Sequence, residues 1–290
     1  MKEHDCLRRF LFEDIGVRGN WVCLNESWRQ AIQFQQANSF ITEHLGQALA
    51  AVTMLSATIK FKGSMILQAQ GDGAIRTLIA QATDDRKIRG LVRCNHAIEQ
   101  GSLEELFGNG HIVLTIDREQ GSPYQGVVPM IGSNFGEALQ SYFQQSEQLN
   151  TRVWLAADAH RAVGLLLQEL PASNQSKEDW ERIEMLTSTV TQQELLTLDS
   201  ESLLYRLFHQ EKVRLFDPEP VAFACTCSLG KIEGTLQAVG RDELDAVLSE
   251  HGYVEVNCEF CGRHYRFDRI AIERLFSTAP SSLDDAQTRH

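Results

Sequence analysis

Four cysteines stand in two close pairs in the last quarter of the chain. The pairs are Cys225-Thr-Cys227 and Cys258-Glu-Phe-Cys261, and residues 228–257 separate them. Two close thiol pairs can converge on one tetrahedral ion, and zinc in structural sites takes four sulfur or nitrogen ligands. The spacing therefore predicts a zinc site without an open coordination position. The first pair is C-x-C where a zinc ribbon normally has C-x-x-C, so the site need not be purely structural.

Structural disulfides are the alternative use of these thiols. The chain opens MKEHDCLRRF, without an apolar h-region, and contains no apolar run of about 18 residues. We therefore expect no secretory signal, no membrane partner and a cytoplasmic location. Cytoplasmic thiols stay reduced, which favours metal binding or redox switching over permanent bridges. The remaining cysteines, Cys6, Cys23 and Cys94, fit the pattern of scattered buried apolar residues.

Two histidines lie near the second cysteine pair. His264 follows Cys261 and His251 precedes Cys258, so either could replace a cysteine ligand. Four sulfurs already complete the shell, and we expect both histidines at the surface or behind the ligands. Four thiolates and one zinc carry a formal charge of about −2. The neighbouring cations that could offset this charge are Lys231, Arg263, His264 and Arg266.

Composition narrows the function classes. The chain has 290 residues, a length that suits about two domains. Its 27 Lys and Arg against 39 Asp and Glu give a net charge of −12, which argues against nucleic acid as the main partner. The Gly71-Asp72-Gly73 sequence lacks the rest of a nucleotide-binding fingerprint and is typical of a hairpin turn. We therefore do not expect a phosphate-binding loop at this position.

The expected fold class is α+β, with the elements that position the cysteines at its end. Residues 1–172 are predicted to form a mixed α/β core domain of β-sheets and packed helices. Its long, mostly buried helix is expected at 43–59, and a second helix at 135–145. The predicted strands lie at 10–12, 16–24, 64–70, 75–80, 89–94, 110–117, 124–128 and 152–157.

A helical linker is predicted at 173–220, after a break in the pattern at 170–176. Thr191 and Glu194 form a capping-box pattern, and Pro218 and Pro220 end the helical region. We expect the linker helices to dock on a core and to draw part of their support from the cysteine domain, because short helices are marginal alone. The apolar positions expected to face inward are Trp180, Ile183, Leu186, Val190, Leu203, Leu204, Leu207 and Phe208.

The last domain is predicted at 221–276. So short a segment favours a metal staple over a hydrophobic core alone. A helix is expected at 242–250, and strands at 253–256 and 265–267 flank Cys258 and Cys261. Residues 277–290 are polar and unpatterned, and are expected to form a flexible tail.

Motifs along nearly the whole chain resemble those of a known family, the bacterial redox-regulated 33 kDa chaperonins. The paired cysteines in CxC and CEFC are the most specific part, and the others follow in the family's order. One departure is SLGK at 228–231, where the family usually has an acidic-basic pair. The further matching stretches are RFLF at 9–12, LGQALA at 45–50, FKGS at 61–64, LQAQGDG at 67–73, YF at 142–143, SEQL at 146–149, GLLLQELP at 164–171 and LYRLF at 204–208.

This resemblance implies a molecular chaperone of the holdase type, not an enzyme. In its terms, Cys225, Cys227, Cys258 and Cys261 bind one zinc ion in the reduced, inactive chain. Oxidation forms the disulfides Cys225–Cys227 and Cys258–Cys261, expels zinc and unfolds the small domain, and the linker loses support. Apolar surface then binds unfolding client proteins, and the oxidised form is expected to be a homodimer.

Two other functions stay open from the residues alone. A zinc-ribbon nucleic-acid module would use the C-terminal arginines, although these also suit a solvated helix face. A thiol oxidoreductase would use Cys258 and Cys261, which lack a thioredoxin-like βαβ context. Salt-dependent nucleic-acid binding and turnover of a disulfide substrate are the respective tests.

Overall fold

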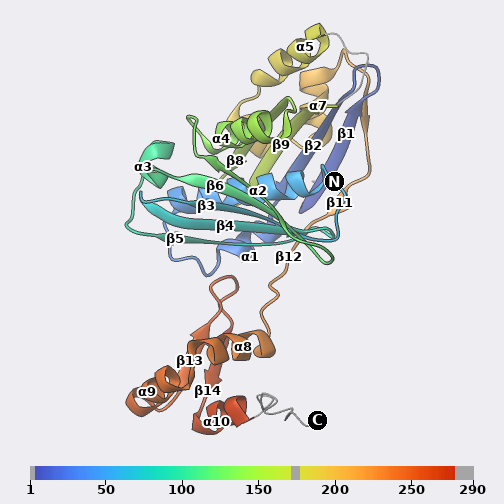
Figure 1. Ribbon diagram of the computed structural model, residues 1–290. Helices are drawn as coiled ribbons and strands as arrows, with labels where there is room; N and C mark the ends of the chain where they lie inside the picture. The colour runs from blue at the N-terminus through green and yellow to red at the C-terminus, as the bar shows by residue number, and fades with distance from the viewer. Residues whose placement is uncertain (1–3, 171–176, 278–290) are drawn as a thin grey trace, which may run out of the picture. The chain divides into compact units, whose positions relative to one another are not determined.

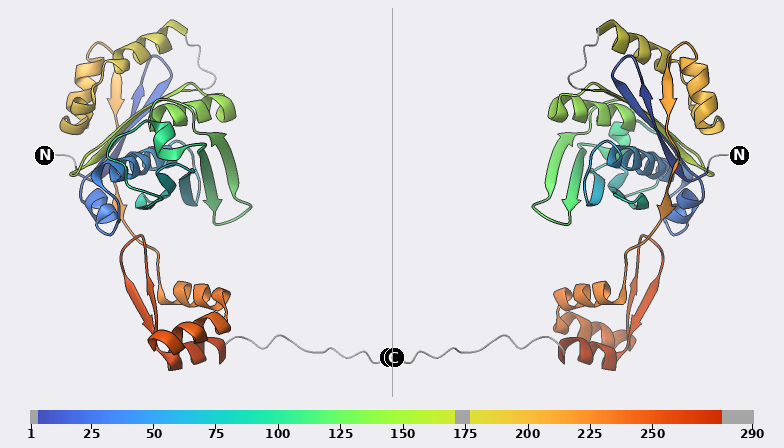
Figure 2. Two further views of the ribbon diagram at one scale, coloured as in Figure 1. Left: turned by 90° about the vertical axis from the view of Figure 1, so that its left-hand side faces the viewer. Right: turned by 90° about the vertical axis from the view of Figure 1, so that its right-hand side faces the viewer.

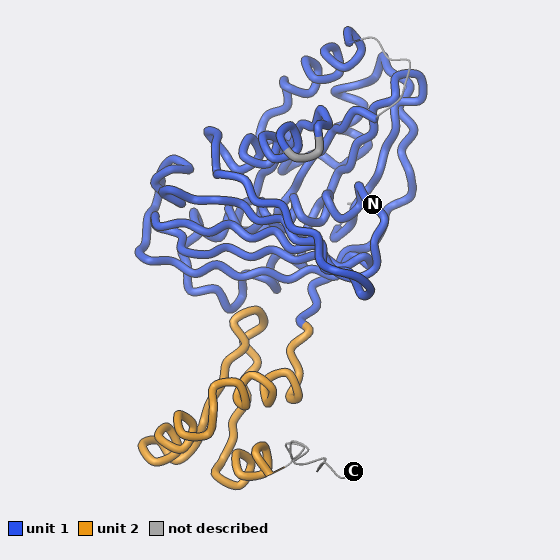
Figure 3. Tube along the Cα trace, in the orientation of Figure 1, with its two compact units in different colours: residues 1–225 blue, residues 226–290 orange. Residues whose placement is uncertain are grey.

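The computed structural model describes residues 4–170 and 177–277, with the backbone alone at residues 146 and 147. Most of the expected break at 170–176 and of the tail at 277–290 lies outside these ranges. Tertiary contacts divide the chain into two compact units, Met1–Cys225 and Thr226–His290 (Figure 3). Both units mix helices and strands, so the expected α+β class is confirmed. The functional boundaries expected at 172/173 and 220/221 stay predictions.

The first sheet of unit 1 has the strand order β10-β1-β2-β9-β8, with β11 also paired to β1. All its pairings are antiparallel. Strand β9 is apolar at nearly every position because both of its faces are buried, in two different clusters. The strands span Cys6–Phe12 (β1), Val17–Leu24 (β2), Thr151–Ala157 (β8), Ala162–Glu169 (β9), Val213–Leu215 (β10) and Glu219–Pro220 (β11).

The second sheet has the order β12-β5-β4-β3-β6-β7. Strands β3 and β4 form the hairpin predicted from Gly71-Asp72-Gly73, with Gln70 opposite Thr77. Only the short β12 runs parallel to its neighbour, β5. The strands span Gly63–Gln70 (β3), Ile75–Thr83 (β4), Lys87–Cys94 (β5), His111–Arg118 (β6), Tyr124–Pro129 (β7) and Ala222–Phe223 (β12).

Helix α2, Ser39–Ser56, lies between the two sheets (Figure 1). It contacts β2, β8 and β9 of the first sheet and β3, β4 and β5 of the second, so it is buried on nearly every side. It begins where the Asn38 side chain accepts a hydrogen bond from the Ile41 amide at 3.1 Å. A Cβ on Gly46 would lie 2.8 Å from the Ala157 methyl, so only glycine permits this close packing. The helix predicted at 43–59 is confirmed, displaced toward the N-terminus.

The remaining helices of unit 1 occupy its edges and its outer face. Helices α5, α6 and α7, which include the predicted linker positions, cover the face of the first sheet turned away from α2 (Figures 1 and 2). The π-helix η1 continues α4, whose helix was predicted at 135–145. The bounds are Glu26–Ile32 (α1), Leu103–Phe107 (α3), Phe135–Tyr142 (α4), Phe143–Glu147 (η1), Lys177–Ser188 (α5), Gln192–Thr197 (α6) and Ser200–Phe208 (α7).

The described residues of unit 2, 226–277, pack three helices and one hairpin around a small apolar cluster. The predicted helix at 242–250 and both predicted strands are present. Helix α8 was not predicted because Gly230 and Gly234 lower its intrinsic helix propensity. Its start is fixed by Ser228, whose hydroxyl accepts a hydrogen bond from the Lys231 amide. The elements span Leu229–Val239 (α8), Arg241–His251 (α9), Val254–Asn257 (β13), His264–Phe267 (β14) and Arg269–Ser277 (α10).

Across the described ranges, we find no helix with both the length and the apolar character that crossing a membrane requires.

Candidate metal centre and the docked linker

The four predicted cysteines come together in space. Their four sulfur atoms all lie within 4.8 Å of one another, and each side chain is half-buried. Zinc–sulfur bonds of about 2.3 Å in a tetrahedron place the sulfurs about 3.8 Å apart. The separation between the sulfurs of Cys227 and Cys261 is 3.4 Å, close to that value. Number, donor type and spacing of the sulfurs therefore fit one tetrahedral metal ion.

The hairpin of β13 and β14 positions the second cysteine pair. The Cys258 amide donates to the Arg263 carbonyl at 2.9 Å, and the Gly262 amide donates back to the Cys258 carbonyl at 2.7 Å. Gly262 has φ +66°, a left-handed conformation that glycine adopts without strain. This turn bends the chain so that the sulfurs of Cys258 and Cys261 point to one place.

Tyr265 and Arg263 place polar hydrogens beside the cluster. The Tyr265 hydroxyl donates a hydrogen bond to the Cys227 sulfur at 3.3 Å. That bond, more than any other cause, raises the pKa of Tyr265. The pKa of Arg263 is raised by Tyr265 first and then by the charges of Cys227 and Cys261. Tyr265 could not be predicted from a sequence motif, because its proximity to Cys227 depends on the hairpin register.

Of the cations expected near the cluster, Arg263 interacts electrostatically with Cys227 and Cys261. Arg266 lies 3.7 Å over the Tyr253 ring, and Lys231 helps to start α8. His264 is exposed, 3.9 Å from Glu255. His251 is exposed too, 3.7 Å from Glu250. In the described part of the chain the candidate ligand group contains cysteines only, so neither histidine takes the place of a sulfur.

The other three cysteines lie away from the cluster. Cys6 and Cys23 are buried in the first sheet, as expected for small apolar residues. Cys94 ends β5 and is half-buried, and this burial raises the pKa of its thiol. A raised pKa lowers the thiolate fraction at neutral pH, which makes Cys94 a weaker nucleophile toward oxidants.

The linker helices dock through the predicted apolar stripe, of which Leu186 and Val190 are half-buried and the other six residues are buried. Trp180, Ile183, Leu203, Leu207 and Phe208 are all buried in one cluster with side chains of β1, β2 and β9. The Phe208 ring packs edge-on against Phe12, with centroids 4.9 Å apart. The apolar side of the linker helices is therefore buried against the first sheet. Support from the cysteine domain stays a prediction.

Polar contacts fix the ends and the edges of the linker helices. Thr191 and Glu194 form the predicted capping box at the start of α6, and Glu194 also pairs with Arg206 of α7. The Thr191 amide is the first cause that lowers the pKa of Glu194. Arg152 of β8 lies 2.5 Å from Glu184 of α5. Such exposed ion pairs contribute little individually, so the apolar stripe dominates docking.

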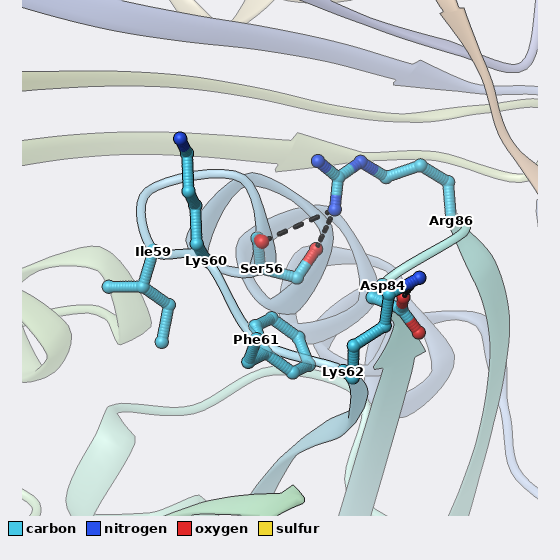
Figure 4. Close-up of a pocket in the computed structure, with 7 residues that line it drawn as sticks. All are labelled: Ser56, Ile59, Lys60, Phe61, Lys62, Asp84 and Arg86. Atoms are coloured by element: carbon cyan, nitrogen blue, oxygen red, sulfur yellow. Dashed lines mark hydrogen bonds and ion pairs between the residues drawn. The ribbon is translucent and has the colours of Figure 1, made fainter. Parts of the chain in front are cut away.

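A cavity of about 540 Å³ opens in unit 1 beside the end of α2 (Figure 4). Its charged side chains are largely engaged with neighbouring groups. Lys62 lies 3.2 Å from Asp84, and Arg86 donates to the carbonyl and hydroxyl oxygens of Ser56 at 3.2 and 3.0 Å. None of the predicted site residues lines this cavity.

Fold and site together define a class: a mixed α/β unit with docked helices, a small second unit of helices and one hairpin, and a cluster of four thiols. The family model described as "Hsp33 protein" matches residues 5–268. A 33 kDa chaperonin of Nitrosococcus oceani is 54% identical over 290 residues, covering 100% of both chains. One from Aeromonas salmonicida is 39% identical over 296 residues, again with 100% of both covered. The chain therefore belongs to the Hsp33 family of 33 kDa chaperonins.

A solved structure agrees with this fold. The crystal structure of the 33 kDa chaperonin from Thermotoga maritima superimposes with a TM-score of 0.82 and covers 94% of this chain and 98% of that one. The two sequences are 24% identical, so this likeness supports the fold alone.

Proposed function

We propose that this chain is an ATP-independent holdase whose activity is switched on by oxidation of Cys225, Cys227, Cys258 and Cys261. The observation that carries the proposal is the convergence of these four sulfurs to within 4.8 Å of one another. Membership of a chaperonin family supplies the class of activity, and the thiol cluster supplies the means of regulating it.

In the reduced state the four cysteines would bind a single zinc ion. Bound zinc would keep all four sulfurs as thiolates and tie the C-x-C segment to the β13–β14 hairpin. Unit 2 has only a small apolar cluster, and structural zinc contributes on the order of 10–16 kcal/mol to the folding of small finger-like units. Whole domains are stable by about 5–15 kcal/mol, so unit 2 would depend on its metal.

Oxidation removes the ligands two at a time. A thiolate attacks a peroxide oxygen and becomes a sulfenic acid as hydroxide leaves. The second thiolate of the pair then attacks that sulfur, a disulfide forms, and a second hydroxide leaves. Two electrons pass to the peroxide for each disulfide, and two protons convert the hydroxides to water. Once Cys258–Cys261 and Cys225–Cys227 have formed, no thiolate remains to hold the metal.

The surface that would bind clients lies beneath the linker helices. Release of α5–α7 would expose large apolar side chains of the first sheet, among them Phe10, Phe12 and Leu165. The docked state also carries a cost. Trp21 Nε1 is buried on this face without a hydrogen-bond partner among the described residues. An unsatisfied buried donor costs about 1–3 kcal/mol, which favours a linker that leaves the sheet readily.

The chain would bind unfolding clients and a second copy of itself, in the cytoplasm. Clients would be unfolding proteins of varied sequence, bound through apolar surface. We also propose that the oxidised chain is a homodimer, works in the cytoplasm, turns over no substrate and binds no nucleic acid. The net charge of −12 favours the last point, because phosphate contacts require Lys and Arg.

One sample tests the switch directly. Bound zinc and suppression of client aggregation are measured on the same purified chain before and after hydrogen peroxide. We expect about one zinc per reduced chain and no suppression, then loss of zinc together with strong suppression. Suppression that is equal in both states, or zinc loss without any gain in suppression, would contradict the proposal.

A further inference from the structure

Cys6 and Cys23 face each other across two neighbouring strands of the first sheet. They are direct partners in the antiparallel register of β1 and β2. Opposite residues of an antiparallel pair project to the same face of the sheet. Both side chains belong to the same apolar cluster, and they are only 6% and 3% exposed. The two thiols are therefore neighbours in space as well as in register.

The hydrogen-bonding pattern fixes the distance between their backbones. The Asp5 carbonyl accepts from Val221, and the Arg9 carbonyl accepts from Phe216, so the odd residues of β1 bond toward β10 and β11. Cys6 therefore bonds toward β2 and forms a hydrogen-bonded pair with Cys23. Such pairs have Cα atoms about 5.5 Å apart, inside the range of about 4.4–6.8 Å found in disulfides. Their Cβ atoms, about 5.5 Å apart, must approach by about 1 Å for a bond to form.

The pair lies on the face that the linker helices cover. The register across the sheet runs from Cys6 through Cys23 to Val163 of β9 and Ala156 of β8. Helix α6 packs on β8 and β9 at one side of this row. At the other side, Arg8 of β1 donates hydrogen bonds to Ser200 and Glu201 at the start of α7. The two thiols thus lie under α6 and the first turn of α7.

We propose that Cys6 and Cys23 form a second, reversible disulfide once α6 and α7 have left the sheet. In the docked state the helices exclude oxidant, and the Cys23 thiol donates a hydrogen bond to Asn25 Oδ1 at 3.0 Å. After release, peroxide oxidises one thiol to a sulfenic acid and releases water. The other thiol then displaces a second water and closes the disulfide. The bond remains strained by the sheet, so thiol reductants cleave it readily.

This inference rests on the proposed function only for its trigger, the release of the linker by oxidation. The cysteine pair itself requires nothing from the metal cluster. A chain whose linker is undocked by mutation must therefore form the Cys6–Cys23 bond even while Cys225, Cys227, Cys258 and Cys261 keep their metal.

Peptide mapping of the full-length chain after timed peroxide exposure and alkylation tests the proposal. In the wild type we expect the Cys6–Cys23 peptide after the Cys258–Cys261 bond. In Leu207→Glu we expect it at least about tenfold faster, because the rate follows the population of the open state. Asp199→Ala, which removes the cap on the Ser202 amide, is a milder second variant that acts in the same direction. Cys94 should remain alkylatable in all chains, and Cys6→Ser should abolish the peptide.

The outcomes separate the two proposals. Equal rates in wild type and in both linker variants, or no Cys6–Cys23 bond in a variant whose linker exchanges hydrogen freely, would overturn this inference. In the second case the metal cysteines can still oxidise and the proposed function survives. If the metal cysteines never oxidise in the wild type while Leu207→Glu forms the bond, the inference stands and the proposed function fails.

Discussion

At the scale of single residues, four thiols from two chain segments share one small volume. The C-x-C segment supplies two sulfurs and the β13–β14 turn supplies the other two, within 4.8 Å of one another. The described ligand group has no spare member, since both nearby histidines lie against carboxylates. Each sulfur should therefore be indispensable for metal binding.

Cys258→Ser tests this requirement. A serine hydroxyl is a poor substitute for a thiolate toward zinc, so we expect bound zinc in the purified reduced protein to fall by at least tenfold. The matched control is Cys94→Ser, which removes a half-buried thiol outside the cluster and should leave one zinc per chain. Elemental analysis of both proteins provides the measurement. Full zinc content in Cys258→Ser would show that the cluster is not the metal site.

The two cysteine pairs should oxidise in a fixed order. The Cys258-Glu-Phe-Cys261 turn already brings its ends close, through the bond from the Cys261 amide to the Cys258 carbonyl at 3.3 Å. A C-x-C pair is more strained, because extended residues two apart lie near the upper limit of about 6.8 Å for disulfide Cα atoms. We expect Cys258–Cys261 first and Cys225–Cys227 later or under harsher conditions. Bridges between the two pairs as the main product in a peptide-mapping time course would refute this order.

A residue of the site could be predicted from the sequence only where a short motif identifies it. The cysteine spacing is written in two short motifs, so the cluster could be foreseen. The bond from Tyr265 to Cys227 joins residues 38 apart and depends on the β13–β14 register, which no short motif encodes. The same holds for Cys6 and Cys23, which appear in the sequence as scattered apolar residues.

At the scale of elements, the linker helices are amphipathic segments whose apolar side rests on a sheet. The spacing of the apolar residues predicted the stripe at Trp180, Ile183, Leu203, Leu207 and Phe208. The sheet that this stripe packs on could not be predicted, because the first sheet assembles from both ends of the unit 1 sequence. Helix α8 was not predicted for another reason. Its two glycines lower its intrinsic helix propensity, and the packing of Leu236 in the apolar cluster of unit 2 compensates for this loss.

Leu207→Glu should release the linker without oxidant. Leu207 is 4% exposed, and burying a side chain of that size contributes roughly 1.5–3 kcal/mol, to which a buried charge adds a penalty. We expect the reduced, zinc-bound variant to suppress aggregation. Tyr205→Glu is the matched control, because Tyr205 lies on the same helix but is 74% exposed and should leave the chain inactive. A mobile linker in Leu207→Glu with no suppression would show that linker release is not the switch.

At the scale of the whole molecule, the two units differ in how much apolar core stabilises their folds. Among the described residues, unit 1 has two extensive apolar clusters and unit 2 has one small cluster. The α+β class was predicted from the patterning and is confirmed, whereas the functional domain boundaries stay predictions. The predicted linker, 173–220, includes β11, which pairs with β1, and the domain predicted at 221–276 includes β12, which pairs with β5.

Metal removal should therefore separate the stabilities of the units. We expect a chelator strong enough to extract zinc from the reduced protein to unfold residues 226–277 and to leave the two sheets of unit 1 folded. The α8–α10 amides should lose protection in NMR spectra while those of β3, β4 and β9 keep it. Restored signals on adding zinc would verify that the loss is due to the metal. Continued protection of the unit 2 amides after metal removal would show that unit 2 does not need a metal to stay folded.

The central claim is that oxidation of the thiol cluster releases the linker from the first sheet. Hydrogen exchange of the full-length chain, reduced with zinc and then oxidised with peroxide, measures this directly. The account predicts faster exchange across residues 178–276, including the buried amides of α5 and α7, with most of residues 1–170 still protected. Unchanged protection of α5 and α7 in a fully oxidised, zinc-free and active chain would contradict it.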